Sequence, residues 1–177
     1  MVVSVALLTA ADLITAYLPV VGERNGIAPV VVGALLAARG LSAAASRMLL
    51  GHLSRRWSRR TLVLASTIGG AVTTALLAIT AWVPLLAVAL VLGGFLLGLG
   101  QPLTMTQVAL AVSRRGRSEA LALRLVGNRV AQAVIPLAAG SVAVGLGVGA
   151  AFWLQSALLV AATVWEASSR DGGGGQV

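Results

Sequence analysis

Asp12 and Arg39 interrupt long apolar runs, which makes them the first candidates for chemistry in this sequence. Counted at about 1.5 Å per helical residue from the polar turn at 22–26, Asp12 lies about 15 Å deep and Arg39, on the next, antiparallel helix, about 18 Å deep. An ionised group is costly in apolar surroundings, so each needs a partner or a water-filled cavity. The similar depths predict a pair between the two helices. Such a pair could line a cavity and gate or bind a substrate. Alternatively, it is a structural ion pair in which each side chain only neutralises the charge of the other.

A second polar cluster is predicted around Arg129, roughly 15 Å from the start of its apolar run. Asn128 precedes it, and Gln132 follows it by three residues, a spacing that places two side chains on one side of a helix. The three polar side chains indicate that this part of the helix lines a cavity and does not simply pack against other helices. Arg47 and Arg124 lie within about two turns of the end of their runs. Extension of the side chain to lipid headgroups, or contact with the basic segment after Arg47, explains them adequately.

A third group consists of Gln101, Thr104 and Gln107, which follow one another by three residues. On a helix this spacing forms a polar stripe that shifts gradually around the axis. Pro102 lies within it, frees a backbone carbonyl and permits a kink. The stripe predicts either a substrate pathway or ordinary hydrogen bonding between helices.

Enzyme chemistry finds little support. The sequence has no cysteine and one histidine, His52, so thiolate sites and sites with two histidines are excluded. No H-E-x-x-H motif, paired carboxylates or Ser/His/Asp set lies in the apolar runs, and no P-loop lysine follows the glycines. The sequence therefore predicts no enzyme, no cofactor and no metal site.

The composition indicates that the elements carrying these residues lie in a lipid bilayer. Hydrophobic residues make up 58% of the 177 residues and charged residues 10%, against about 25% charged in ordinary globular domains. The net charge of +8 comes from arginines that lie mostly between apolar runs. Membrane topology explains this basicity better than a nucleic-acid partner does.

Six apolar runs are long enough to cross a bilayer as helices. They predict an all-α integral membrane protein with one six-helix transmembrane bundle over residues 1–170 and a disordered Gly-rich tail at 171–177. The expected spans are residues 3–21, 28–50, 61–81, 84–112, 119–144 and 150–168.

Arginines are distributed unequally between the two sets of alternating loops. One set holds eight arginines and the other holds only Arg24. The eight are Arg55, Arg56, Arg59, Arg60, Arg114, Arg115, Arg117 and Arg170. The positive-inside rule then predicts that both chain ends face the cytoplasm. Because all basic side chains are arginine and alanine is abundant, the composition hints at a GC-rich bacterium, and hence at the bacterial inner membrane.

The segment after the second run resembles a motif of the major facilitator superfamily, G-x-L-(A/S)-D-R-x-G-R-(R/K). That motif joins the second and third spans of each six-helix half, and it has the same register here. The matching residues are Gly51, Leu53, Ser54, Arg56, Arg59 and Arg60. Arg55 replaces the family's Asp and Ser58 its second Gly, which weakens the cytoplasmic gating role that the motif implies.

Two further segments, 98–106 and 117–129, resemble the tenth span and the start of the eleventh span of bacterial members. The resemblance implies the C-terminal half of a twelve-span secondary transporter, which moves a small solute by alternating access around a midplane site. Its expected partner is a second six-helix half, supplied by another chain or by self-pairing. A truncated gene product, and a membrane subunit or scaffold that transports nothing, are the alternatives.

Overall fold

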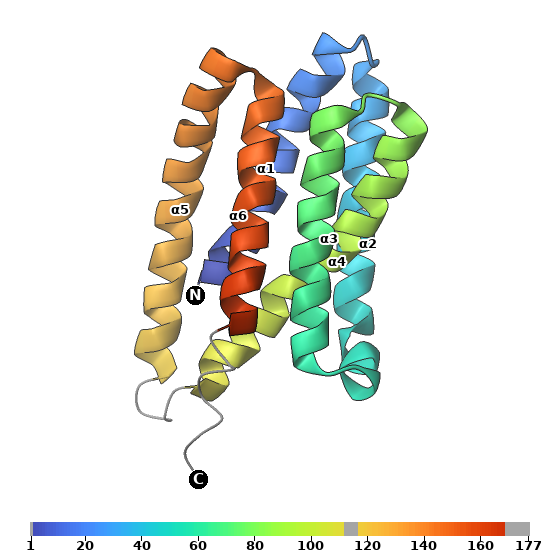
Figure 1. Cartoon of the computed structure of the whole chain (residues 1–177). Coiled ribbons are helices and arrows are strands. Elements are labelled where there is room, and N and C mark those ends of the chain that lie inside the picture. The colour runs from blue at the N-terminus through green and yellow to red at the C-terminus, as the bar shows by residue number, and fades with distance from the viewer. Residues whose placement is uncertain (1, 112–116, 169–177) are drawn as a thin grey trace.

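The computed structural model describes residues 2–111 and 117–168. These ranges form six α-helices. Their bounds are Val2–Arg24 (α1), Pro29–Arg56 (α2), Arg59–Ile79 (α3), Val83–Ala111 (α4), Arg117–Leu146 (α5) and Val148–Ser168 (α6). The helices run alternately up and down a bundle (Figure 1). The start of α1, the α2–α3 turn, the start of α5 and the end of α6 therefore lie at one end.

The α1–α2, α2–α3 and α5–α6 turns are short and have identifiable local causes. Gly26 and Gly147 adopt φ values of 66° and 88°, a left-handed conformation that glycine reaches without steric cost. At the start of α3 the Ser58 side chain accepts a hydrogen bond of 3.1 Å from the backbone N–H of Thr61. This bond satisfies one of the free donors at the helix start.

The basic motif lies on helices and not in a loop, which corrects the interpretation of residues 51–60 as a loop. The helix α2 continues to Arg56, and α3 begins at Arg59. Only Trp57, which is extended, and the capping Ser58 separate them. Leucine and arginine are good helix formers, so the apolar run of α2 continues as helix after its hydrophobicity ends.

Four helices have a stretch that is long and apolar enough to cross a membrane by length and composition. These stretches are Val3–Arg24, Pro29–Arg56, Arg59–Ile79 and Val83–Thr106, and a shorter apolar helix covers Gly149–Val164. The helix α5 is not among them in the described part of the chain. Its sequence carries Asn128, Arg129 and Gln132 in the middle, which lowers its hydropathy.

The buried core lies between α1, α3, α4 and α6. These helices contribute large side chains that are almost fully buried, such as Leu7, Val63, Leu90 and Phe152. Gln155 on α6 is 1% exposed and donates hydrogen bonds to the Ala6 carbonyl (3.0 Å) and to Thr9 Oγ1 (3.3 Å) on α1. Gln155 is thus a packing residue that joins α6 to α1.

The helices α2 and α4 approach each other at two glycines. A Cβ at Gly94 would lie 2.9 Å from Cγ of Arg39, and a Cβ at Gly98 would lie 2.8 Å from Cα of Ala43. Close to this contact, Ser42 Oγ donates a 2.6 Å hydrogen bond to the Val91 carbonyl. The small residues at Gly94 and Gly98 therefore allow the close helix packing that their spacing predicts.

Candidate functional site

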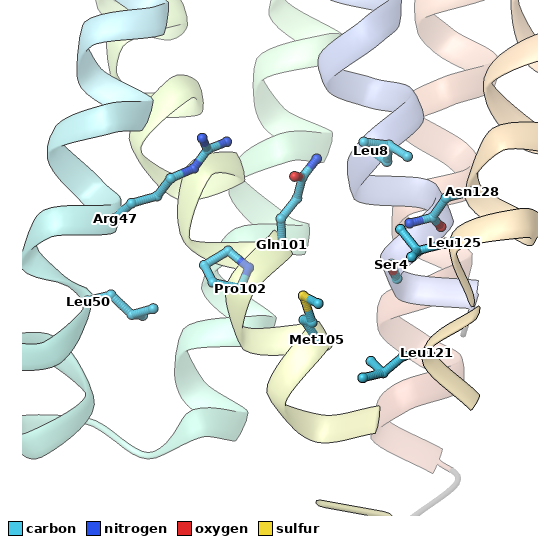
Figure 2. A pocket seen from close by; sticks show the side chains of 10 residues that line it. All are labelled: Ser4, Leu8, Arg47, Leu50, Gln101, Pro102, Met105, Leu121, Leu125 and Asn128. Carbon is cyan, nitrogen blue, oxygen red and sulfur yellow. The ribbon is translucent and has the colours of Figure 1, made fainter. Parts of the chain in front are cut away.

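A cavity of about 370 Å³ opens between α1, α2, α4 and α5. Figure 2 shows side chains from all four helices facing this space. The lining residues are Ser4, Leu8, Arg47, Leu50, Gln101, Pro102, Met105, Leu121, Leu125 and Asn128. This volume falls within the range of about 300–1,000 Å³ that is usual for small-molecule sites.

Each helix presents its cavity residues at helical spacing. Leu121, Leu125 and Asn128 of α5 follow one another by four and three residues, and Gln101 and Met105 of α4 are four apart. Such spacings place side chains on one face of a helix. The cavity therefore forms where one face from each of four helices meets the others.

Of the residues predicted from the sequence, Gln101 and Asn128 line the cavity together. The Oδ1 atom of Asn128 is buried and has no hydrogen-bond partner. Leaving a buried acceptor unpaired is costly. Asn128 thus gives the cavity wall a polar group, although its Oδ1 is covered by protein.

Arg47 is the functional candidate that the sequence interpretation passed over. Its side chain is exposed and lines the cavity opposite α5 (Figure 2). It makes no hydrogen bond or ion pair with any residue that the structure describes. Because Arg47 lies near the end of its apolar run, the sequence suggested contact with headgroups instead. The one sequence feature that could have indicated this position is the spacing of three residues between Arg47 and Leu50, which places both side chains on the cavity side of α2.

The predicted polar stripe of α4 is divided by the structure. Gln101 and Pro102 line the cavity, whereas Thr104 is buried and its Oγ1 donates to the carbonyls of Gly100 (2.9 Å) and Gln101 (3.0 Å) on its own helix. The side chain of Gln107 lies outside the described residues, as does that of Arg124. The Thr104 hydroxyl is therefore satisfied within its own helix, and Thr104 is not among the residues that line the cavity.

A separate polar cluster joins α1 to α5. Gln132 Nε2 donates a 2.9 Å hydrogen bond to Asp12 Oδ2, and Arg129 NH1 donates a 3.1 Å bond to Gln132 Oε1. The three side chains thus form a chain of two hydrogen bonds that ends on the exposed Arg129. The three-residue spacing of Arg129 and Gln132 predicted their proximity, but nothing in the sequence linked either one to Asp12.

The direct ion pair expected between Asp12 and Arg39 is absent from this part of the structure. Arg39 instead donates to Thr15 Oγ1 at 2.8 Å and to the Ala11 carbonyl at 3.0 Å. Its Nε atom is buried without a partner. Asp12 is still near enough to attract the guanidinium charge. The two residues share a depth, but the rotation of α1 directs the carboxylate toward α5.

The basic motif lies at the same end of the bundle as the cavity. Leu53 is half-buried and packs against the core, whereas Gly51 has open space around it. Arg55 and Arg56 line a shallow hollow of about 360 Å³ together with His52. The remaining two motif arginines, Arg59 and Arg60, are exposed in the first turn of α3.

No group of three or more His, Cys, Asp or Glu residues that could hold a metal ion occurs within residues 2–111 and 117–168.

Comparison with known proteins gives one informative match. A family model described as Major Facilitator Superfamily matches residues 1–170, which is nearly the whole chain. No curated protein and no solved structure matches the chain.

Proposed function

The chain belongs to the major facilitator superfamily, whose members are transporters and not enzymes, and we propose that it is one six-helix half of a secondary transporter. Family membership implies a lipid bilayer around the helices and a solute as substrate. In the proposed mechanism, two six-helix halves rock around a site near the midplane and expose it to each side in turn.

The cavity between α1, α2, α4 and α5 carries this proposal. It has polar groups from each of the four helices and an apolar remainder, which is the usual composition of a solute site. The helices α3 and α6 do not line it and pack extensively against each other instead. A second bundle placed against α2 and α5 would close the cavity between two halves.

The exposed apolar side chains of α2 and α5 support that placement of a partner. Met48 on α2 is 84% exposed and Leu137 on α5 is 73% exposed. In a bilayer such residues face either lipid or another helix. We propose that the second half is another six-helix chain or a second copy of this one, and that it covers part of these two helices.

We assign the chain to spans seven to twelve of the family. The motif at the α2–α3 turn has Arg55 at the position of the family's acid and Ser58 at the position of its second glycine. Such departures are usual in the copy of the motif that lies in the C-terminal half. The segments 98–106 and 117–129 resemble the tenth and eleventh spans and support the same assignment.

The arginine distribution supports a location in a bacterial inner membrane with both chain ends in the cytoplasm. The cavity lies toward the end of the bundle that carries the α2–α3 turn, as the position of Leu50 on α2 indicates. In this orientation the cavity is on the cytoplasmic side of the midplane. A solute would enter or leave it from the cytoplasm.

Pro102 allows α4 to bend, and this bending would change the shape of the cavity. Proline has no N–H group, so the carbonyl of Gly98, four residues earlier, lacks its usual helical partner. Figure 1 shows the part of α4 that follows turning toward the lower end of α5, which it contacts. We propose that α4 bends at Pro102 during the transport cycle and moves Gln101 and Met105 relative to α5.

A flux assay tests the proposal. The chain is reconstituted into proteoliposomes alone or with a co-expressed six-helix partner, and a panel of labelled sugars, amino acids, organic cations and organic anions is offered under a proton gradient. We expect flux of at least one solute only from the paired assembly or from a dimer. Gln101→Leu should abolish this flux, whereas Trp82→Phe, outside the cavity, should not.

Two outcomes contradict the proposal. Robust flux by a demonstrated monomer would show that the chain is not a half. Absence of flux for every pair and every solute would favour the role of a membrane subunit or scaffold that transports nothing.

A further inference from the structure

Arg47 is the single charged residue among the ten that line the cavity. No described residue offers it a hydrogen bond or an ion pair. A guanidinium is permanently charged and presents donors in a fork that matches a carboxylate or another planar anion. Since none of the ten lining residues is a carboxylate, the cavity wall itself supplies no counter-charge to Arg47.

The rest of the cavity wall is mostly apolar. Leu8, Leu50, Met105, Leu121 and Leu125 come from all four helices that form the cavity. Figure 2 shows Leu50, Met105 and Leu121 on the side of the cavity nearer the α2–α3 turn, with the ends of Arg47 and Gln101 pointing away from that turn. Leu8 lies level with the end of Arg47, so the wall places one charged group among apolar side chains, as an amphipathic ligand would require.

Asn128 adds a second polar group to the wall. It lies across the cavity from Arg47 (Figure 2), but its Oδ1 is covered by protein and is not open to a ligand in the cavity.

We propose that the cavity binds an amphipathic organic anion: a small molecule whose carboxylate, or equivalent group, pairs with Arg47. Its alkyl or aryl body contacts the leucines and Met105. An organic cation is disfavoured because Arg47 repels it and no acid lines the site. A sugar is disfavoured because six of the ten lining residues are apolar side chains. The inference rests on the proposed function, since it identifies this cavity as the solute site.

Equilibrium binding to the whole chain tests the charge requirement without any need for flux. The chain is placed in nanodiscs of neutral phosphatidylcholine, and octanoate, octanamide and octylamine are titrated against it, with empty nanodiscs as the reference. We expect octanoate to bind about tenfold to 100-fold more tightly than octanamide, the range for one charge-assisted hydrogen bond. Octylamine should bind more weakly than either.

Variants at one position assign the charge preference to Arg47. Arg47→Gln should lower the affinity for octanoate to that for octanamide, whereas Arg47→Lys should keep most of the preference. Arg55→Gln removes the same charge outside the cavity and serves as the matched control. Thermal unfolding and elution as a single species establish that each variant is folded. Equal binding of the acid, amide and amine, or equal effects of Arg47→Gln and Arg55→Gln, would overturn the proposal.

An anionic lipid headgroup could supply the same chemistry from the bilayer. Repeating the titrations in nanodiscs with phosphatidylglycerol distinguishes the two sources. If phosphatidylglycerol weakens octanoate binding to the unmodified chain and to Arg47→Lys but not to Arg47→Gln, a lipid is the natural ligand of Arg47 and the proposal is overturned. If binding is unchanged, the site takes a free solute. Anion binding without flux in any pair would sink the transport proposal and leave the ligand class intact.

Discussion

Gly98 gives the sharpest test of the contact between α2 and α4. A Cβ at this position would lie 2.8 Å from both Cα and the carbonyl oxygen of Ala43, whereas ordinary van der Waals contact begins at 3.4 Å. These are backbone atoms, which cannot rotate aside as the end of a side chain can. Gly98→Ala must therefore separate the two helices by about 0.6 Å or distort one of them.

The expected loss of stability follows from a comparison with Gly40. No atom lies within 4 Å of a Cβ at Gly40, which is also inside a helix. Glycine to alanine raises intrinsic helix propensity by about 1 kcal/mol at either position, so this gain cancels between the two variants. The remaining difference is the cost of overpacking, about 1–3 kcal/mol. Gly98→Ala should be less stable than Gly40→Ala by that amount.

Unfolding of the purified chain in mixed micelles, titrated with denaturing detergent, measures this difference. Gly40→Ala should match or slightly exceed the unmodified chain, while Gly98→Ala should unfold at a lower detergent fraction. Separation of the helices should also weaken the hydrogen bond from Ser42 to the Val91 carbonyl. If the two alanine variants unfold together, the close approach of α2 and α4 at Gly98 is refuted.

Three further predictions concern topology and polar contacts. A cysteine from Arg59→Cys should resist an impermeant thiol reagent in intact cells, while one from Asn25→Cys should react, and the reverse pattern would invert the proposed topology. Gln155→Leu should lower the free energy of unfolding by about 1 kcal/mol because it removes the hydrogen bonds to α1; unchanged stability would contradict this. Asp12→Leu and Gln132→Leu should be coupled by about 0.6–1.7 kcal/mol in a double-mutant cycle, and strictly additive effects would show that their hydrogen bond does not stabilise the fold.

The number and order of the helices could be predicted from the sequence because their signals are local. Run lengths, turn glycines and interspersed arginines are properties of single segments, and each helix of a membrane bundle must satisfy its own backbone. The proximity of Arg129 and Gln132 was predictable for the same reason, since a spacing of three residues determines it within one helix. The extension of α2 through Arg56 was missed because hydrophobicity marks the membrane boundary and not the end of a helix.

Contacts between helices depended on the tertiary structure. Counting residues gives the depth of a side chain in the bundle, and on that basis Asp12 and Arg39 were expected to pair. Depth leaves the rotation of each helix about its own axis undetermined. That rotation directs Asp12 to Gln132 on α5 and leaves Arg39 with Thr15 and the Ala11 carbonyl.

The cavity illustrates the same division. Gln101 and Asn128 were candidates by residue type, but Arg47 was assigned to the headgroups from its position along one helix. Its place opposite α5 follows from the packing of α2 on α4, which the small residues Gly94 and Gly98 allow. A sequence specifies which side chains each helix can offer. Only the packed bundle determines which faces meet, because helix rotation is set by the combined contacts of all neighbouring helices and not by any one segment.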